Sequence, residues 1–477
     1  MVGEIKFGII GLEAAVFALG ILIMTLDMIY RGSRPDIIRK VAIFGMALLV
    51  GYSFHPGQTG IGWHGMLLVD SAAYFFKSLF LVAALLVFIM MTRSEELVGR
   101  VPAEYYALGS FATLGMLFMA SSHNLMTLFM ALELLTISFY ILVAYSKDEE
   151  LGLEAGIKYL IIGTVSAAFI LLGIAFIYGA TGSLDYSRIT EAIQSSRGYD
   201  SILIPGVILL LLGLGFKISA IPFHSWAPDV YQGAPTPVVA FLSVGSKAAG
   251  FILLQRLIYS VFIPLKPTWG LLLSVVAVIT LLYGNLGAIP QTNIKRLLGY
   301  SGIAQAGYLI LGLVAGSLDG GAAMLYYLTG YLFSNLLAFT VIVIFRQAVT
   351  SHRIIDYSGL ARRSPILAAS LLVAMLSLAG VPPLVGFFGK FLLIESVIRA
   401  GYSWLAIVAI LNVVVALFYY LQVVRVMYVN LPTQAHQIKV SRPMKAVLYA
   451  CIVAILALGL FQGPLYDISL SATRPLF

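Results

Sequence analysis

Four ionisable residues lie inside separate apolar stretches, each long enough to cross a lipid bilayer: Glu133, Lys217, Lys247 and Lys390. A lone charge in hydrocarbon costs about 2.5 to 3.5 kcal/mol on insertion scales, so such side chains usually face the protein interior or an internal water path. A carboxylate and three amines can each bind and release a proton. Since buried ion pairs are an expensive way to gain stability alone, we interpret the four residues as a proton path. Structural ion pairs are the alternative.

The composition identifies the solvent of the whole chain. Hydrophobic residues make up 60% of the 477 positions and charged residues only 10%, which is typical of a protein with many membrane spans. The net charge of +8 is spread over short loops between apolar stretches, and this pattern does not predict a nucleic-acid partner. We expect a single membrane domain over residues 1–477, embedded in lipid.

Residues that commonly hold metals or redox centres are scarce. The one cysteine, Cys451, cannot supply the four thiolates that an iron–sulfur cluster typically needs. His55, His64, His352 and His436 fall in loops without partners at metal-binding spacing. We therefore expect no cofactor and no metal in this chain, so that any redox centre belongs to a partner.

The apolar stretches predict an all-α polytopic membrane fold. Backbone amides in lipid must bond internally, and these stretches are too long and too continuous for barrel strands. A window of about 19 residues predicts about fourteen transmembrane helices. Their approximate limits are 9–30, 38–54, 72–92, 104–121, 123–144, 156–179, 202–226, 235–260, 268–289, 297–316, 322–345, 366–398, 403–429 and 444–463.

Two of these helices, the seventh and the twelfth, carry prolines in their interior. Pro222 and the pair Pro382–Pro383 each remove backbone donors, so we expect both helices to be broken. Carbonyls freed at such breaks can hold water or cations in ion-translocating proteins. Lys217 and Lys390 lie within about two turns of the breaks, which favours a functional break over a plain proline kink. His224 follows Pro222 closely and could titrate near neutrality as an accessory member of the path.

The order of the spans suggests an internal repeat. An N-terminal three-helix segment (1–103) would precede a first five-helix repeat (104–260), a second five-helix repeat (268–429) and a C-terminal helix (444–463). A unit with an odd number of helices reverses its orientation when it repeats, as in the inverted repeats of transporters. The two broken helices would then occupy equivalent fourth positions.

Position along the predicted spans and loops distinguishes the basic residues outside the path. Sixteen Lys and Arg residues fall in loops after odd-numbered spans and six in the other loops and termini, so the positive-inside rule places both termini outside. Lys77, Arg256 and Arg425 lie near predicted helix ends, where we expect them to reach the headgroups as anchors. Lys158 is equally compatible with an anchor and with an accessory role. Glu395 is expected to pair with a neighbouring arginine, Arg399, four positions later.

The chain resembles the antiporter-like membrane subunits of respiratory complex I, a family shared with Mrp-type sodium/proton antiporters. The resemblance covers nearly the whole chain. It rests on Glu133 in the fifth span and on four sequence motifs: GFKISAIPFHSWAPDVYQGAPTPV (215–238), SKAAG (246–250), NIKRLLGYSGIAQAGY (293–308) and GVPPLVGFFGKF (380–391). Within the family the chain is most similar to N-type subunits, because it stops soon after the last span and has Lys390 where M-type subunits have glutamate.

The resemblance implies a proton path with assigned roles. Glu133 and Lys217 would be a coupled pair, Lys247 the central relay and Lys390 the exit site, with His224 and Lys158 as accessory residues. At about 6 Å and an effective dielectric constant near 20, the first pair would interact by about 2.8 kcal/mol. Moving the glutamate away would release the proton of the lysine.

The resemblance also implies a setting for the chain. It would be a subunit of a NADH:quinone oxidoreductase in a bacterial inner membrane, next to M-type and K-type membrane subunits. NADH, FMN, iron–sulfur clusters and quinone would bind in partner subunits. A subunit of a Mrp-type antiporter and a structural membrane subunit without proton flux are the alternatives.

Overall fold

The computed structural model describes residues 7–30, 33–55, 57–92, 103–146, 149–195, 201–432 and 437–477. Six of the basic residues counted for the positive-inside rule lie outside the described residues: Lys6, Arg31, Arg93, Arg100, Lys147 and Arg197. The predicted loop residue His436 lies outside them as well.

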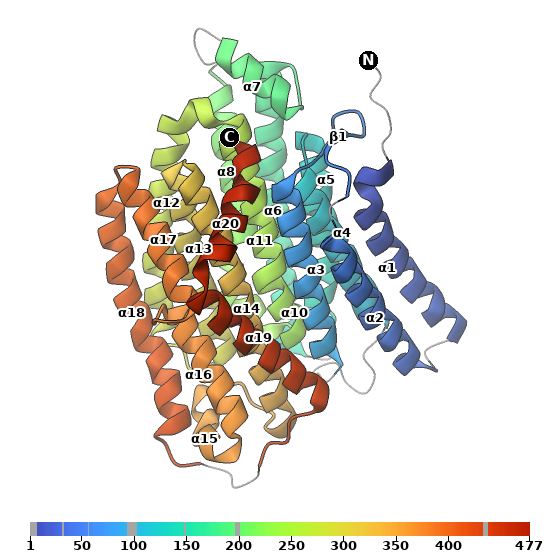
Figure 1. Cartoon of the computed structure of the whole chain (residues 1–477), viewed down its shortest axis with the longest axis vertical. Coiled ribbons are helices and arrows are strands. Elements are labelled where there is room, and N and C mark those ends of the chain that lie inside the picture. The colour runs from blue at the N-terminus through green and yellow to red at the C-terminus, as the bar shows by residue number, and fades with distance from the viewer. Residues whose placement is uncertain are drawn as a thin grey trace.

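The described chain is almost entirely helical (Figure 1). The helices are α1 (Gly11–Tyr30), α2 (Pro35–Ser53), α3 (Ser71–Met91), α4 (Ala103–Ser121), α5 (Leu125–Val143), α6 (Glu150–Thr181), α7 (Tyr186–Ser195), α8 (Leu203–Ile218), α9 (Trp226–Gly233), α10 (Thr236–Phe241), α11 (Lys247–Arg256), α12 (Lys266–Ala288), α13 (Ile294–Ala315), α14 (Leu318–Ala348), α15 (Leu360–Arg363), α16 (Pro365–Ala379), α17 (Val385–Arg399), α18 (Ser403–Tyr428), α19 (Arg442–Leu460) and α20 (Gln462–Thr473).

A few shorter elements complete the fold. Strands β1 (Gly60–Gly62) and β2 (Leu67–Val69) form an antiparallel hairpin in which Gly60 pairs with Val69. Single 3₁₀ turns and two π-helical turns make up the rest, at Phe7–Ile10, Leu242–Ser246 (π), Leu257–Val261 (π), Ile263–Leu265, Ile354–Tyr357 and Arg474–Leu476. The all-α prediction is therefore confirmed, and the hairpin between α2 and α3 is its one exception in the described residues.

Ten helices of the described residues are long and apolar enough to cross a membrane. Three of these segments form the centre: Thr236–Val261, α13 and α14 have 100%, 94% and 94% of their most apolar windows buried. In the outer segments α6, α18 and α19 only 33% is buried, and apolar side chains cover their outward faces. That distribution matches a bundle whose periphery contacts lipid or neighbouring subunits.

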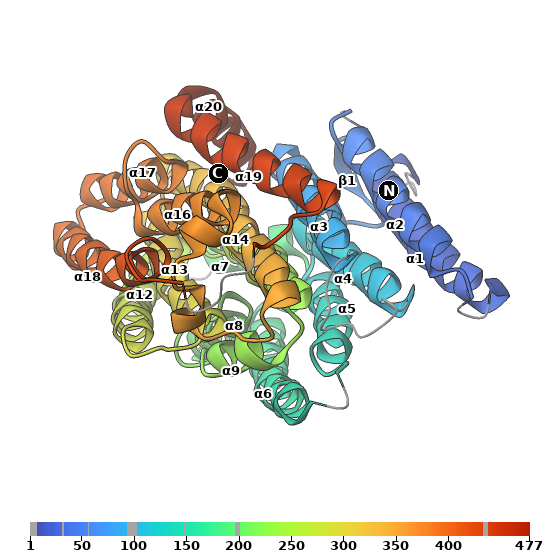
Figure 2. The same ribbon diagram turned by 90° about the horizontal axis from the view of Figure 1, so that it is seen from below.

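The C-terminal helices connect the N-terminal segment with the second half of the chain. Figure 2 shows α19 and α20 running across the bundle from the α3 side toward α17. Tyr326 of α14 donates a hydrogen bond to the carbonyl of Leu458 at 2.7 Å, and Ser71 at the start of α3 donates one to the carbonyl of Ser471 at 2.9 Å. The helix pair thus packs against both the N-terminal segment and the second half of the chain.

Both predicted helix breaks are present. The seventh span ends as α8 at Ile218, earlier than the predicted limit, and Ser219 turns the chain with a left-handed φ of 60° before α9 begins. The twelfth span divides into α16 and α17 around Gly380, whose φ of 88° favours glycine. Proline in each gap prevents the helical ladder from continuing.

Two basic residues that were predicted to anchor the chain at headgroups are buried instead, so that interpretation is wrong. Lys77 forms an ion pair of 2.7 Å with Glu13 across the α1 and α3 helices, with both side chains 2% exposed. Arg256 of α11 pairs with Asp70 at the start of α3. Neighbouring elements cover these helix ends, so neither side chain reaches the surface. Arg425 is exposed near the end of α18, in keeping with an anchor.

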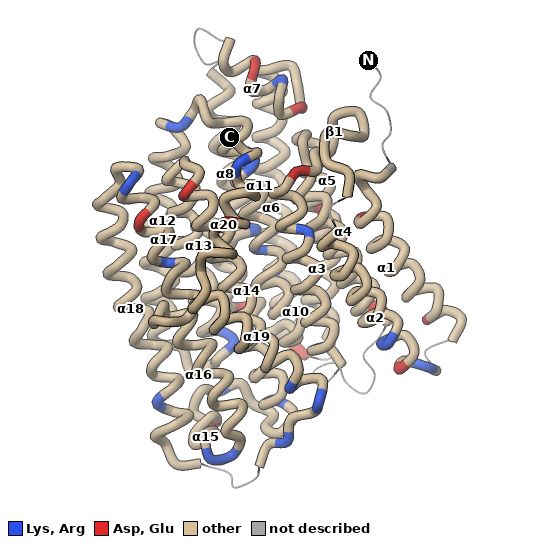
Figure 3. Tube along the Cα trace, in the orientation of Figure 1, with Lys and Arg blue, Asp and Glu red and all other residues tan. Residues whose placement is uncertain are grey.

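Charge is distributed unevenly between the two ends of the bundle. Figure 3 shows Lys and Arg gathered toward the end where α15 lies, with fewer at the end where α7 lies. The C-terminal Phe477 and the start of α1 lie toward the α7 end (Figure 1).

Candidate functional site

Lys217 is a buried cation at the end of the first broken helix. Its side chain is 2% exposed, and its ammonium has no hydrogen-bond partner among the described residues. The ring centre of Phe216 lies 5.4 Å from the ammonium. Gly250 of α11 makes room for the lysine, because a Cβ there would lie 3.0 Å from the Lys217 Cβ. A buried ammonium without a hydrogen-bond partner is unfavourable inside a membrane protein unless water or a nearby negative charge compensates it.

Glu133 of α5 supplies the opposite charge nearby. Its side chain is partly exposed. It interacts electrostatically with Lys217, although no direct ion pair between them is present in the described structure. The pair therefore interacts through space rather than by direct contact.

Lys158 belongs to a network of ion pairs rather than standing alone. Its ammonium lies 2.6 Å from Glu154 on the same helix and 2.7 Å from Asp229 of α9. Arg296 of α13 contacts the other oxygen of Asp229 at 2.5 Å. The spacing of Glu154 and Lys158 could have been recognised as an i,i+4 pair, but the partnership of Asp229 with Arg296 depends on tertiary packing.

Lys247 occupies the centre of the bundle. It is 2% exposed, and its ammonium donates hydrogen bonds to the carbonyl of Gly302 at 2.5 Å and to the hydroxyl of Tyr331 at 3.5 Å. The π-helical turn Leu242–Ser246 immediately precedes it. π turns often occur at functional sites, and nothing in this stretch of sequence predicted one.

Lys390 lies on the second broken helix and reaches back to the break. Its ammonium donates to the carbonyls of Leu378 and Ala379 at 2.8 and 3.1 Å, in the last turn of α16. These carbonyls have no intrahelical partner because the helix ends there. The ring of Tyr308 lies 4.6 Å below the ammonium. The break thus supplies acceptors for a cation, as the sequence predicted.

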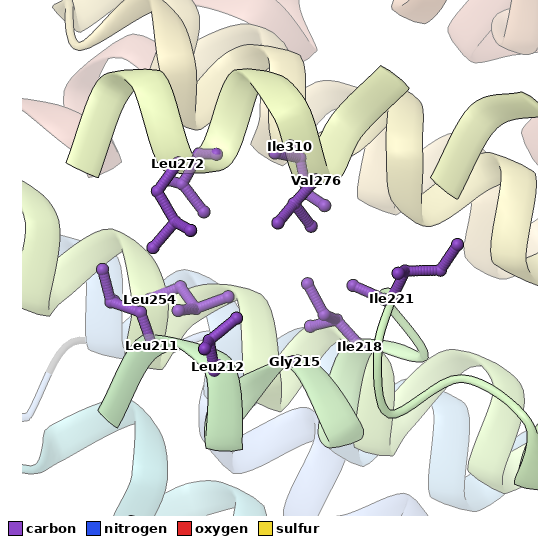
Figure 4. A pocket seen from close by; sticks show the side chains of 11 residues that line it. Leu211, Leu212, Gly215, Ile218, Ile221, Leu254, Leu272, Val276 and Ile310 are labelled. Carbon is purple, nitrogen blue, oxygen red and sulfur yellow. The ribbon is translucent and has the colours of Figure 1, made fainter. Parts of the chain in front are cut away.

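His224 lies apart from these contacts in the described structure. Its ring is 3.3 Å from the carbonyl of Pro222 and makes an edge contact with Tyr283, with ring centres 4.2 Å apart. Beside the first break there is also a cavity between α8, α11, α12 and α13 (Figure 4). Apolar side chains line it, so it offers water no hydrogen-bond partners. No cluster of three or more His, Cys, Asp or Glu side chains suited to a metal occurs in the described residues.

Comparison with known proteins extends over the whole chain. Residues 122–416 match the family described as NADH:quinone oxidoreductase/Mrp antiporter, TM. A protein of Desulforamulus reducens named NADH-quinone oxidoreductase subunit N is 42% identical over 473 residues, which cover 99% of each protein.

Solved structures show the same similarity. One chain of respiratory complex I from Thermus thermophilus with bound aureothin is 33% identical, with a TM-score of 0.81 over 96% of this chain and 98% of that chain. One chain of the Mrp complex from Dietzia sp. DQ12-45-1b has a TM-score of 0.82 at 19% identity over 98% of each chain, a similarity of fold alone. Both the matched segment and the full-length relative lead to one conclusion: the chain belongs to the NADH:quinone oxidoreductase/Mrp antiporter family of membrane subunits.

Proposed function

We propose that the chain is the N-type proton-translocating membrane subunit of a NADH:quinone oxidoreductase, respiratory complex I. The observation that carries the proposal is the row of three buried lysines, Lys217, Lys247 and Lys390, two of which lie at breaks in membrane helices. The names of the full-length relatives support the same function. As a subunit of this enzyme the chain acts as a translocase, and its own residues carry protons rather than electrons.

The proton path uses the residues in the order Glu133, Lys217, Lys247 and Lys390. Glu133 stabilises the charged form of Lys217, and movement of that carboxylate releases the proton toward Lys247. Lys247 then passes a proton toward Lys390, whose ammonium is held at the second break. Lys158 adjusts the entrance through its ion pair with Asp229. His224 is an accessory residue on the water side of the first break.

The architecture that goes with this path has fourteen spans. The three-helix segment 1–103 precedes the inverted repeats 104–260 and 268–429, and the helix 444–463 follows them. Both termini lie on the outer, periplasmic side of a bacterial inner membrane, an orientation supported by the excess of Lys and Arg at the α15 end (Figure 3).

The partners are other membrane subunits of the same complex, including antiporter-like M-type and K-type neighbours. This assembly is supported by the likeness to chains of solved complex I. NADH, FMN, iron–sulfur clusters and quinone bind in partner subunits. Quinone reduction there drives the proton steps here.

Removing either member of the first pair tests the function. We expect Lys217→Ala and Glu133→Ala to assemble into the complex yet lose coupled proton pumping, because the through-space interaction that releases the proton is gone. Proton uptake and NADH oxidation would be measured together in inverted membrane vesicles. Lys445→Ala, which removes an exposed lysine at the start of α19, serves as the control and should pump normally.

The same vesicles separate this function from the alternatives. Full pumping by both variants would reject the proton path and favour a structural subunit. Proton exchange that depends on sodium and proceeds without quinone would instead identify a subunit of a Mrp-type antiporter.

A second variant tests the position of the central lysine. In Gly302→Ala the new Cβ would lie 3.1 Å from the Lys247 ammonium and 3.4 Å from the hydroxyls of Tyr231 and Tyr331. Because the ammonium must move away from its carbonyl acceptor, we expect an assembled complex with slower pumping. The control is Gly51→Ala in α2, where the Cβ meets nothing within 4 Å. Equal pumping rates for the two variants would show that the contact of Lys247 with α13 does not matter.

A further inference from the structure

A chain of hydrogen-bonded polar side chains links the backbone segments that hold Lys247 and Lys390. It starts on α13, where Ser301 adjoins the Gly302 carbonyl that holds the Lys247 ammonium. It ends at the Leu378 carbonyl, which accepts hydrogen bonds from both Lys390 and Gln305 of α13. The acceptor of Lys247 and the side chain that shares an acceptor with Lys390 therefore both lie on α13, at positions 302 and 305, less than one turn apart.

Tyr420 of α18 connects the two ends of this chain. Its hydroxyl is hydrogen-bonded to the hydroxyl of Ser301 and accepts a hydrogen bond of 3.2 Å from the amide nitrogen of Gln305. Ser301 and Gln305 stand four positions apart on α13, so they face the same side and can hold one phenol between them. Tyr420 is fully buried, as are Ser301 and Gln305.

Gln305 makes three hydrogen bonds within this group. Its two amide hydrogens go to the Leu378 carbonyl at 3.0 Å and to Tyr420, and its oxygen accepts from the hydroxyl of Tyr327 on α14. Since the Tyr420 oxygen accepts from the amide, the phenol keeps its own hydrogen to donate, and either hydroxyl of the Tyr420–Ser301 pair can be the donor in their hydrogen bond. The amide of Gln305 is thus fully occupied, whereas the hydroxyls of Tyr420 and Ser301 each carry a proton that can be exchanged along the chain.

We propose that Tyr420 is the proton-passing link between Lys247 and Lys390, and that Gln305 is the positioning residue that holds its hydroxyl in line. The inference rests on the proposed proton-translocating function. When the Ser301 hydroxyl donates its proton to the phenol oxygen, the proton of the phenol leaves to water on the Lys390 side and the serine takes a proton from water on the Lys247 side. One proton moves, and both hydroxyls stay neutral. Water completes the chain between the hydroxyls and the two amines. The nitrogen of a side-chain amide donates hydrogen bonds and does not accept a proton. Gln305 therefore positions the hydroxyl of Tyr420 and carries no proton itself.

Removal of the hydroxyl is the first test. In the assembled complex, Tyr420→Phe should lose most of the protons moved per NADH oxidised, measured in inverted vesicles. The matched control is Tyr259→Phe, because Tyr259 is also buried and donates its hydroxyl to an α13 carbonyl, that of Gly312 at 2.7 Å, outside the chain. Lys217→Ala is measured beside them to show that the subunit carries flux.

A substitution that preserves size separates proton transfer from packing. Difluorotyrosine placed at position 420 in the full complex makes the phenol more acidic while the ring stays nearly the same size. We expect the pH profile of proton pumping to move to lower pH, whereas difluorotyrosine at position 259 leaves the profile unchanged. Packing or assembly defects do not produce such a shift, and this measurement stands even if Tyr420→Phe fails to assemble.

The outcomes are distinct. If Lys217→Ala loses pumping while Tyr420→Phe keeps it, the link is overturned and the proposed function stands. If both variants pump fully, the proposed function falls and the link with it. A loss in Tyr420→Phe without any shift for difluorotyrosine would reduce Tyr420 to a packing role and overturn the inference. Loss together with the shift supports it.

Discussion

Replacing Arg256 with methionine should destabilise the folded chain by about 3 to 5 kcal/mol, the cost of leaving one partner of a buried ion pair uncompensated. Arg256 is 2% exposed and contacts both oxygens of Asp70, at 2.6 and 3.0 Å. Its third hydrogen bond, 2.7 Å long, goes to the carbonyl of Ala120 at the end of α4. One guanidinium thus joins α11, α4 and the start of α3, and its loss leaves a carboxylate buried without a cation.

The expected result is a low level of the variant in membranes and an early thermal transition of the solubilised complex. Asp70→Asn isolates the charge, because asparagine can still cap α3 as Asp70 does through its 2.8 Å contact with the Ala73 amide. Removing both charges in Arg256→Met with Asp70→Asn should recover part of the loss. As a comparison, Arg399→Ala breaks an exposed i,i+4 pair, which water and salt screen and which should contribute little to stability. Equal stability of the Arg256 and Arg399 variants would contradict the importance of burial.

Gly386→Ala should be still less tolerated, because no space exists for its side chain. The new Cβ would lie 1.8 Å from the carbonyl oxygen of Ser377, a backbone atom of α16 that cannot rotate away. The first turn of α17 must then separate from α16, and Lys390 would leave its acceptors on that helix. Overpacking typically costs about 1 to 3 kcal/mol and sometimes more, and we place this variant at or above the upper end.

The amount of the chain that copurifies with its complex in mild detergent would measure this effect. Gly463→Ala in α20 is the control, because its Cβ meets nothing within 4 Å and alanine is preferred to glycine within a helix. Normal assembly of Gly386→Ala would mean that α16 and α17 do not pack as closely as the structure has them.

Much of the fold could be predicted because lipid leaves the backbone few choices. Long apolar runs must be helices, and prolines inside two of them predicted the breaks around Pro222 and Pro382. The position of Lys390 beside freed carbonyls followed from the same reasoning. These features depend on residues close together in sequence, where hydropathy and proline chemistry are sufficient.

The failures concern partners that are distant in sequence. Lys77 and Arg256 lie near helix ends, and their depth in the sequence could not show that Glu13 and Asp70 would cover them from other helices. The bridge from Lys158 through Asp229 to α13 was missed for the same reason. The distance of a residue from the end of its own helix predicts the exposure of its side chain only where no other element covers that helix end.

The number of residues in the π-helical turn Leu242–Ser246 determines the direction in which the Lys247 side chain points. A π turn holds one residue more than the α-helical turn it replaces, and successive α-helical residues point about 100° apart. With one residue fewer in this turn, Lys247 would face away from the Gly302 carbonyl by about that angle. Deletion of a single residue in this turn would therefore separate Lys247 from its acceptor on α13, although every residue of the proton path would still be present.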